Sequence, residues 1–128
     1  IRAGRAIEYR QGIYHAMGWN FGPMNAMVRG TTPWDPANYT QRDPSHAFYS
    51  QQLLEGFPPG SDTGAKTDAK PEIWQHFDDF TAKMHNFQDA AAKLATLAAG
   101  NDQAATRQAF VDTAKACKAC HEKYHNDD

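Results

Sequence analysis

The sequence of 128 residues lacks long apolar runs, an excess of basic residues and more than two cysteines. A membrane-spanning helix needs about 20 consecutive apolar residues, so we expect no membrane span. The 13 lysines and arginines are outnumbered by 15 aspartates and glutamates, which argues against the basic face that nucleic-acid binding requires. Runs of alternating β-branched residues are also missing, and their absence argues against a β-sheet.

Helical periodicity dominates what is present. Apolar residues recur at alternating spacings of three and four in four segments, which indicates amphipathic helices. Such helices bury their apolar stripes most simply against one another. The sequence therefore predicts an all-α fold, an antiparallel up-down-up-down four-helix bundle that forms a single domain over residues 1–128. The expected helices cover residues 1–29, 35–56, 71–100 and 102–124, and the longest loop covers 56–69.

Local signals mark where these helices begin and where they are disturbed. Asp35, followed by a proline, and Asp102 are the residue type that caps helix N-termini. Pro23 lies inside the first segment and should bend it, because proline removes one backbone donor. Asp43-Pro44 should kink the second segment or divide it into two short helices.

The two cysteines form one local motif, Cys117-Lys118-Ala119-Cys120-His121. The spacing Cys-x-x-Cys-His is the attachment signature of c-type haem. Positions i, i+3 and i+4 of a helix share one face, so both thiols can add to the vinyl groups of one porphyrin edge. We expect one covalently attached haem c, with thioether bonds from Cys117 and Cys120 and with His121 as the axial iron ligand.

The Cys-x-x-Cys spacing has two other uses in proteins. A thioredoxin-like redox pair opens a helix within a βαβ unit, and this sequence shows no strands. A zinc site could use Cys117, Cys120, His121 and His125, but one helix does not easily place four ligands tetrahedrally around an ion. The motif, its helical context and the size of the core together favour haem.

Further short segments outside the motif carry a family resemblance. They are Tyr9-Arg10-Gln11, Met17-Gly18-Trp19-Asn20, Phe21-Gly22, Asp68-Ala69-Lys70-Pro71-Glu72-Ile73-Trp74 and Ala109-Phe110. Together with a haem motif near the C-terminal end, they resemble the cytochrome c′ family nearly end to end. The resemblance implies a periplasmic, usually dimeric protein whose haem iron is five-coordinate and high-spin. It also implies a restricted second face of the haem that admits NO and CO.

The resemblance assigns residues around the haem edge. Arg10 and Gln11 match a pair that contacts the propionates and the rim, although a buried arginine stem covering the core is the structural alternative for Arg10. Thr67, Asp68 and Glu72 match a stretch over the haem edge, where the alternative for Asp68 is a helix cap.

Tyr14 matches the family position that faces the iron from the side opposite the axial histidine. A tyrosine there can block small ligands and can donate a hydrogen bond to one; ordinary core packing is the alternative. Met17, Phe21 and Phe57 are further candidates for the pocket wall. Since Met17 lies three residues past Tyr14, it could instead be a sixth iron ligand, which would make the chain a low-spin electron carrier.

One position departs from the family pattern, and several polar residues lie outside the expected haem site. His125 occupies a position that is usually Arg or Lys, near the axial histidine. Trp19 lies off the core stripe and suits a homodimer interface through the first two helices. Catalysis is not expected, because Tyr14 is a poor base; the redox partner protein is not identified. Solvated or capping positions are expected for His15, His46, His76, His85, Asp78 and Asp79.

Overall fold

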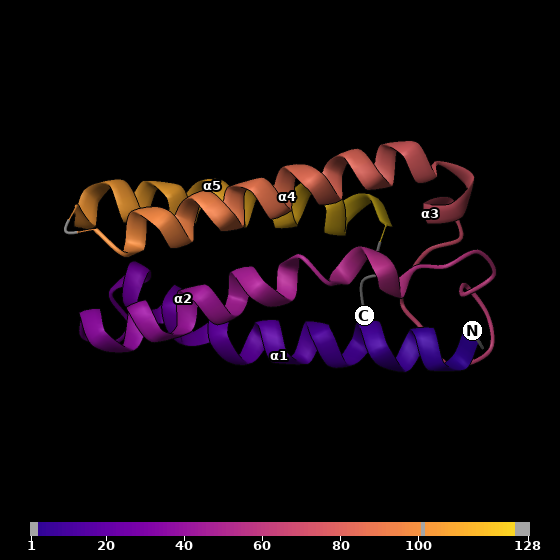
Figure 1. The fold of residues 1–128 in the computed structure, drawn as a ribbon, viewed down its shortest axis with the longest axis horizontal. Coiled ribbons are helices and arrows are strands. Elements are labelled where there is room, and N and C mark those ends of the chain that lie inside the picture. The colour runs from indigo at the N-terminus through magenta and orange to yellow at the C-terminus, as the bar shows by residue number, and fades with distance from the viewer. Residues whose placement is uncertain (1–2, 101, 125–128) are drawn as a thin grey trace.

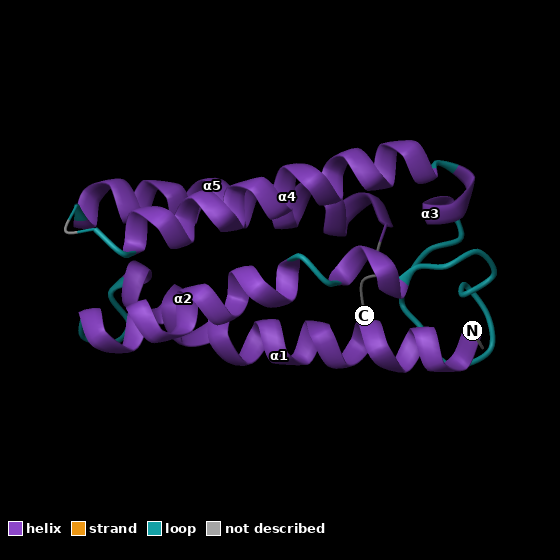
Figure 2. Ribbon diagram, in the orientation of Figure 1, coloured by secondary structure: helices purple, strands orange, loops and turns teal. Residues whose placement is uncertain are grey.

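The structure, a computed structural model, describes residues 3–100 and 102–124. Within them, four long helices lie in two layers: α1 packs beside α2, and α4 packs beside α5 (Figure 1). Successive long helices run in opposite directions, and none of the described residues belongs to a β-strand (Figure 2). The expected antiparallel four-helix bundle is confirmed. The long helices are α1 (Ala3–Arg29), α2 (Pro36–Ser50), α4 (Phe77–Ala98) and α5 (Gln103–Tyr124).

One end of the bundle carries its irregular elements. A short 3-10 helix, η1 (Leu53–Gly56), precedes the long loop, and a single-turn helix, α3 (Glu72–Gln75), follows it. The loop is held to the last turn of α5, because the Lys70 N–H donates to the Tyr124 carbonyl at 2.9 Å. The end of α5 is thereby fixed against the segment that connects the two layers.

The expected caps are present. The Asp35 side chain accepts a hydrogen bond from the Asn38 N–H at 3.1 Å, and Pro36 is the first residue of α2. Asp102 accepts from the Ala105 N–H at 2.9 Å in the first turn of α5. Both aspartates satisfy backbone donors that lack a partner inside the helix.

The predicted division of the second helix at Asp43-Pro44 is wrong. α2 continues through Pro44 to Ser50, and the break follows at residues 51–52. Pro44 and Thr40, whose carbonyl loses its helical donor, are both exposed, so water can satisfy that carbonyl. In α1, Pro23 likewise frees the Trp19 carbonyl.

The Trp19 carbonyl finds a donor from the neighbouring helix. The Arg42 guanidinium of α2 lies 3.4 Å from this oxygen. α1 remains one helix over its 27 residues, so the proline is accommodated by a contact between helices.

The segment expected as one helix from residue 71 to 100 is two. α3 ends and α4 begins at His76, whose backbone is non-helical with φ −128° and ψ 48°. The turn places Ile73 in the core and lets the Trp74 indole donate to the Pro58 carbonyl at 3.0 Å. This contact with the long loop explains a break that periodicity does not show.

The apolar interior consists of two clusters. One surrounds Leu53, Phe80 and Met84 at the loop end, and the other surrounds Met24 and Leu94 at the opposite end. No helix among the described residues is long and apolar enough to cross a membrane.

Candidate functional site

A cavity of about 740 Å³ opens between the two layers at the loop end of the bundle. This volume lies within the usual range for small-molecule and cofactor sites, about 300–1,000 Å³. Its lining is mostly apolar and includes Leu53, Phe57, Phe80, Met84 and Phe87. An apolar cavity of this size suits a large, flat, hydrophobic group rather than a small polar substrate.

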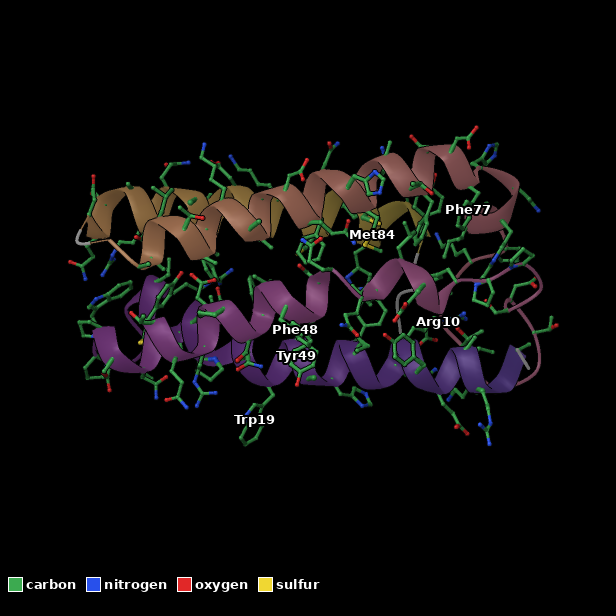
Figure 3. All side chains as sticks on the ribbon, viewed as in Figure 1. Arg10, Trp19, Phe48, Tyr49, Phe77 and Met84 are labelled. Carbon is green, nitrogen blue, oxygen red and sulfur yellow. The ribbon has the colours of Figure 1, made fainter. Side chains whose placement is uncertain are left out.

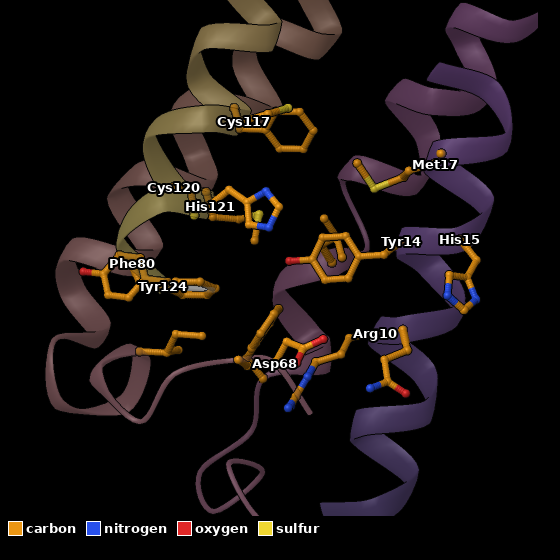
Figure 4. Close-up of a pocket in the computed structure, with 18 of the residues that line it drawn as sticks. Arg10, Tyr14, His15, Met17, Asp68, Phe80, Cys117, Cys120, His121 and Tyr124 are labelled. Atoms are coloured by element: carbon orange, nitrogen blue, oxygen red, sulfur yellow. The ribbon is translucent and has the colours of Figure 1, made fainter. Parts of the chain in front are cut away.

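The α5 wall of the cavity carries the Cys-x-x-Cys-His motif. Cys117 and Cys120 are half-buried and His121 is exposed, and all three border the cavity. Figure 4 shows the three side chains on consecutive turns of α5, facing the same space. The helical spacing thus brings the two thiols and the imidazole together as the sequence predicts.

The pKa values of the two thiols help to distinguish between the possible functions of the motif. Burial, together with the charge of Cys120, raises the pKa of Cys117 to about 12, and burial also raises the pKa of Cys120. Redox-active and zinc-binding cysteines need thiolates, whose pKa values are lowered. Among the described residues, no three His, Cys, Asp or Glu side chains are grouped to hold a metal ion. The raised pKa values disfavour the thioredoxin-like interpretation.

The opposite wall is formed by α1. Tyr14, Met17 and Phe21 all border the cavity, and Figure 4 shows the Tyr14 ring reaching across it toward Cys120 and His121. The side chain of Tyr14 is 43% accessible because it borders this cavity. Removal from bulk water, reinforced by the nearby Cys120, raises the Tyr14 pKa above its usual range. The hydroxyl therefore keeps its proton at neutral pH.

The loop end of the cavity is organised by Arg10, which is only 2% exposed. Its Nη1 donates to the Gly56 carbonyl at 3.1 Å and to Ser61 Oγ at 2.8 Å. Its Nη2 donates to the Ser61 carbonyl at 2.7 Å and to Thr67 Oγ1 at 3.0 Å. Beside it, Gln11 Nε2 donates to the Lys66 carbonyl at 2.9 Å. Both terminal nitrogens of Arg10 are therefore engaged in holding η1 and the long loop, a role that was not expected.

Gly56 makes this arrangement possible. A Cβ atom at Gly56 would lie 2.7 Å from the Arg10 Cβ, closer than two non-bonded carbon atoms normally approach. We expect Gly56→Ala to lower the free energy of unfolding by about 1–3 kcal/mol, the usual range for overpacking. Gly12→Ala is the matched control, because nothing lies within 4 Å of that position on α1 and alanine favours a helix. Equal urea midpoints for the two variants would contradict the proposed close contact.

A second network holds the end of α5 against α4. Asp79 accepts hydrogen bonds from the Tyr124 hydroxyl and from Lys123 Nζ, the latter at 2.8 Å. Lys83 also lies 3.4 Å from this carboxylate. The bonds from Lys123 and Tyr124 hold the pKa of Asp79 well below its usual range. The sequence led us to expect Asp79 as a solvated surface charge, but it holds the end of α5 instead. No local sequence pattern links Asp79 to Tyr124, which lies 45 positions further along the chain.

Comparison with known proteins decides the family. The family model described as cytochrome c′ matches residues 5–125. The chain belongs to the cytochrome c′ family. It is 36% identical over 119 residues to cytochrome c′ of Alcaligenes xylosoxydans xylosoxydans, covering 93% of this chain and 91% of that protein.

Solved structures of cytochrome c′ share the whole fold. Cytochrome c prime from Shewanella frigidimarina matches with a TM-score of 0.95 and 44% identity, covering 98% of each chain. A nitric oxide complex of a variant of cytochrome c prime from Alcaligenes xylosoxidans matches with a TM-score of 0.90 and 34% identity, covering 100% of this chain and 98% of that one.

A covalently attached haem c is the cofactor of the cytochrome c′ family, and the cavity fits it. The space is large enough, its lining is apolar, and two protonated thiols stand on one wall. Thr67 and Asp68 border the cavity, as do the wall candidates Phe21 and Phe57. Glu72 is exposed at the start of α3 and does not border it. His125 lies outside the described residues.

His46 is the cavity residue that sequence reasoning placed wrongly. It was expected at the surface but is 1% exposed. Its ring lies between Phe21, with centroids 5.0 Å apart, and Phe87, at 5.8 Å, and it borders the inner end of the cavity. The spacing of seven from Tyr39, an apolar position of α2, was the available signal.

Proposed function

We propose that this chain is a single-domain gas-binding protein of the periplasm, with Cys117 and Cys120 holding the haem and His121 as the sole protein ligand of its iron. The haem supplies a five-coordinate, high-spin iron atom that can bind NO or CO and accept one electron. The observation that carries this proposal is the placement of Tyr14 across the cavity from His121 (Figure 4). The nitric oxide complex of a relative with the same fold supports it, and family membership supports the location.

Tyr14 and its neighbours give the distal side its properties. An aromatic ring standing in the cavity limits the room beside His121, so small uncharged diatomic molecules enter best. The protonated hydroxyl can donate a hydrogen bond to such a molecule. Because Tyr14 retains its proton, it cannot act as a general base at neutral pH. We therefore infer a binding and electron-transfer role rather than an enzymatic one.

The alternative role uses Met17 as a sixth iron ligand. Met17 is 7% exposed and borders the same cavity, so a low-spin electron carrier is the second candidate. Of the α1 side chains labelled in Figure 4, however, Tyr14 reaches farthest toward His121. This placement favours the open site.

The test is the optical spectrum of the purified ferrous protein before and after CO is added. We expect a broad high-spin spectrum that sharpens with CO, and the same spectrum after Met17→Leu. A sharp low-spin spectrum that ignores CO and changes with Met17→Leu would establish the electron carrier instead. A mass spectrum of the same sample verifies that haem is attached.

A homodimer through α1 and α2 is part of the proposal. Contiguous apolar patches on a surface mark interaction sites, and α1 and α2 each carry a large exposed apolar side chain. Trp19 of α1 is 74% exposed and Phe48 of α2 is 60% exposed, and Trp19 points away from the bundle (Figure 3). The redox partner protein is left unassigned.

A further inference from the structure

Three buried polar side chains form a row on the inner face of α2. Tyr39, Asp43 and His46 are 1%, 0% and 1% exposed, and their spacing of four and three places them on one side of the helix. The Tyr39 hydroxyl, both Asp43 carboxyl oxygens and His46 Nδ1 have no hydrogen-bond partner among the described residues. They account for four of the five such buried atoms. Buried polar groups are normally bonded, so this row calls for a functional explanation.

Among the buried side chains that the structure describes, none places a fixed charge against Asp43 from the helices packed around it. The buried residues of α1 include one ionisable side chain, Arg10, whose donors are taken by the long loop. Those of α4 include none, and those of α5 include only Tyr124, which is bonded back to α4. On α2 itself, Arg42 points to the α1 backbone, and the ionisable neighbours of Asp43 in the row are Tyr39 and His46. The charge on Asp43 is therefore uncompensated within the described structure.

This environment makes Asp43 titrate near neutrality. Burial alone raises the pKa of Asp43 to about 7 and lowers that of His46 to about 4. At neutral pH the imidazole is therefore uncharged, while the carboxyl is close to the midpoint between its charged and neutral forms. A small change in nearby charge is enough to add or remove its proton.

The row also reaches the cavity. His46 borders the inner end of the cavity, and Asp43 lies three residues away on the same helix, about 4.5 Å along its axis. His46 itself is buried and has the apolar rings of Phe21 and Phe87 on either side. Charges interact more strongly in such surroundings than in water. An electron added in the cavity must therefore raise the proton affinity of Asp43.

We propose that Asp43 is a redox-linked proton site, which takes up one proton when a one-electron donor reduces the haem. An O–H bond forms on the carboxylate with a proton from solvent, the donor loses one electron, and reoxidation reverses both changes. The row on α2 thereby keeps the charge of the bundle core constant. This inference rests on the redox role proposed above.

The test is the midpoint potential of the intact haem protein measured against pH. We expect the potential to fall by up to about 59 mV per pH unit around pH 7, the value for one proton per electron. Asp43→Asn should be flat over the same range. Asp89→Asn, which changes an exposed carboxylate on α4, should keep the slope of the parent protein. A flat parent curve, or an unchanged slope in Asp43→Asn, would overturn the proposal.

A second measurement does not depend on one variant. The infrared difference spectrum between oxidised and reduced parent protein at pH 7 should show the C=O band of a newly protonated carboxyl. This band should be absent from both Asp43→Asn and Asp43→Ala, and its persistence in either would refute the assignment. The ferrous CO spectrum of each sample is recorded alongside. Loss of the CO response signals failure of the proposed gas site, whereas a normal response with no proton uptake signals failure of this inference alone.

Discussion

Asp43→Asn should stabilise the protein at pH 8 by about 4 kcal/mol relative to the parent chain. Burial raises the pKa of Asp43 from 3.8 to about 7, so the folded state binds the proton more tightly than the unfolded state. The stability that Asp43 contributes to the parent chain is fully present below about pH 4, where its carboxyl is protonated in the folded and the unfolded state. The parent chain loses this stability as the pH rises to about 7. Asparagine matches the neutral carboxyl in shape and has no charge to lose.

The pH dependence of this gain is the decisive part of the prediction. The difference between Asp43→Asn and the parent should be near zero at pH 4 and should reach its full size above pH 7. Urea denaturation of both proteins from pH 4 to 8 measures it, and shared contributions of the haem cancel between them. A constant difference across this range would mean that Asp43 is not protonated on folding.

His46 should mask the effect in the parent protein. Its pKa is lowered from 6.5 to about 4 on folding, so the folded state binds fewer protons than the unfolded state in that interval. Stability from His46 therefore rises with pH between about 4 and 6.5, while stability from Asp43 falls. The parent curve should be nearly flat there. The curve of Asp43→Asn should rise, because only the histidine contribution remains.

The helices of this bundle could be predicted because their signals are local. Asp35 and Asp102 cap helices through bonds that span three residues, and such contacts are visible in sequence. The expected division of the second helix at Asp43-Pro44 is wrong because the effect of a proline depends on its surroundings. The carbonyl freed by Pro23 is satisfied by Arg42 of another helix, and Pro44 lies on an exposed face. The effect of each proline is thus set by its surroundings in the fold, which the local sequence does not show.

The candidate site likewise contains residues that the sequence places together and contacts that it does not show. Cys117, Cys120 and His121 share a helix face by their spacing alone, so sequence places them together. The loop contacts of Arg10 span 46 to 57 residues, and nothing in the local pattern links that arginine to Gly56 or Thr67. A family resemblance could point to Arg10 as important, but the geometry shows that it also holds the loop closed.

Removing the Tyr14 ring should have the largest effect on gas binding. Tyr14 stands between α1 and His121 in the cavity (Figure 4), so a ligand beside the iron must displace it. We expect Tyr14→Ala to raise CO affinity by about ten- to a hundredfold, which corresponds to roughly 1.4–2.8 kcal/mol. Equilibrium titration of the ferrous protein with CO measures the change.

Tyr14→Phe separates the bulk of the side chain from its hydroxyl. This variant keeps the ring, so CO affinity should stay close to that of the parent protein. A ligand that accepts a hydrogen bond from Tyr14 should bind Tyr14→Phe more weakly, by about 0.5–1.5 kcal/mol or up to about tenfold. If Tyr14→Ala binds CO no better than the parent, the ring does not restrict the site. The distal barrier would then have to come from the neighbouring wall at Met17 and Phe21, which border the same cavity.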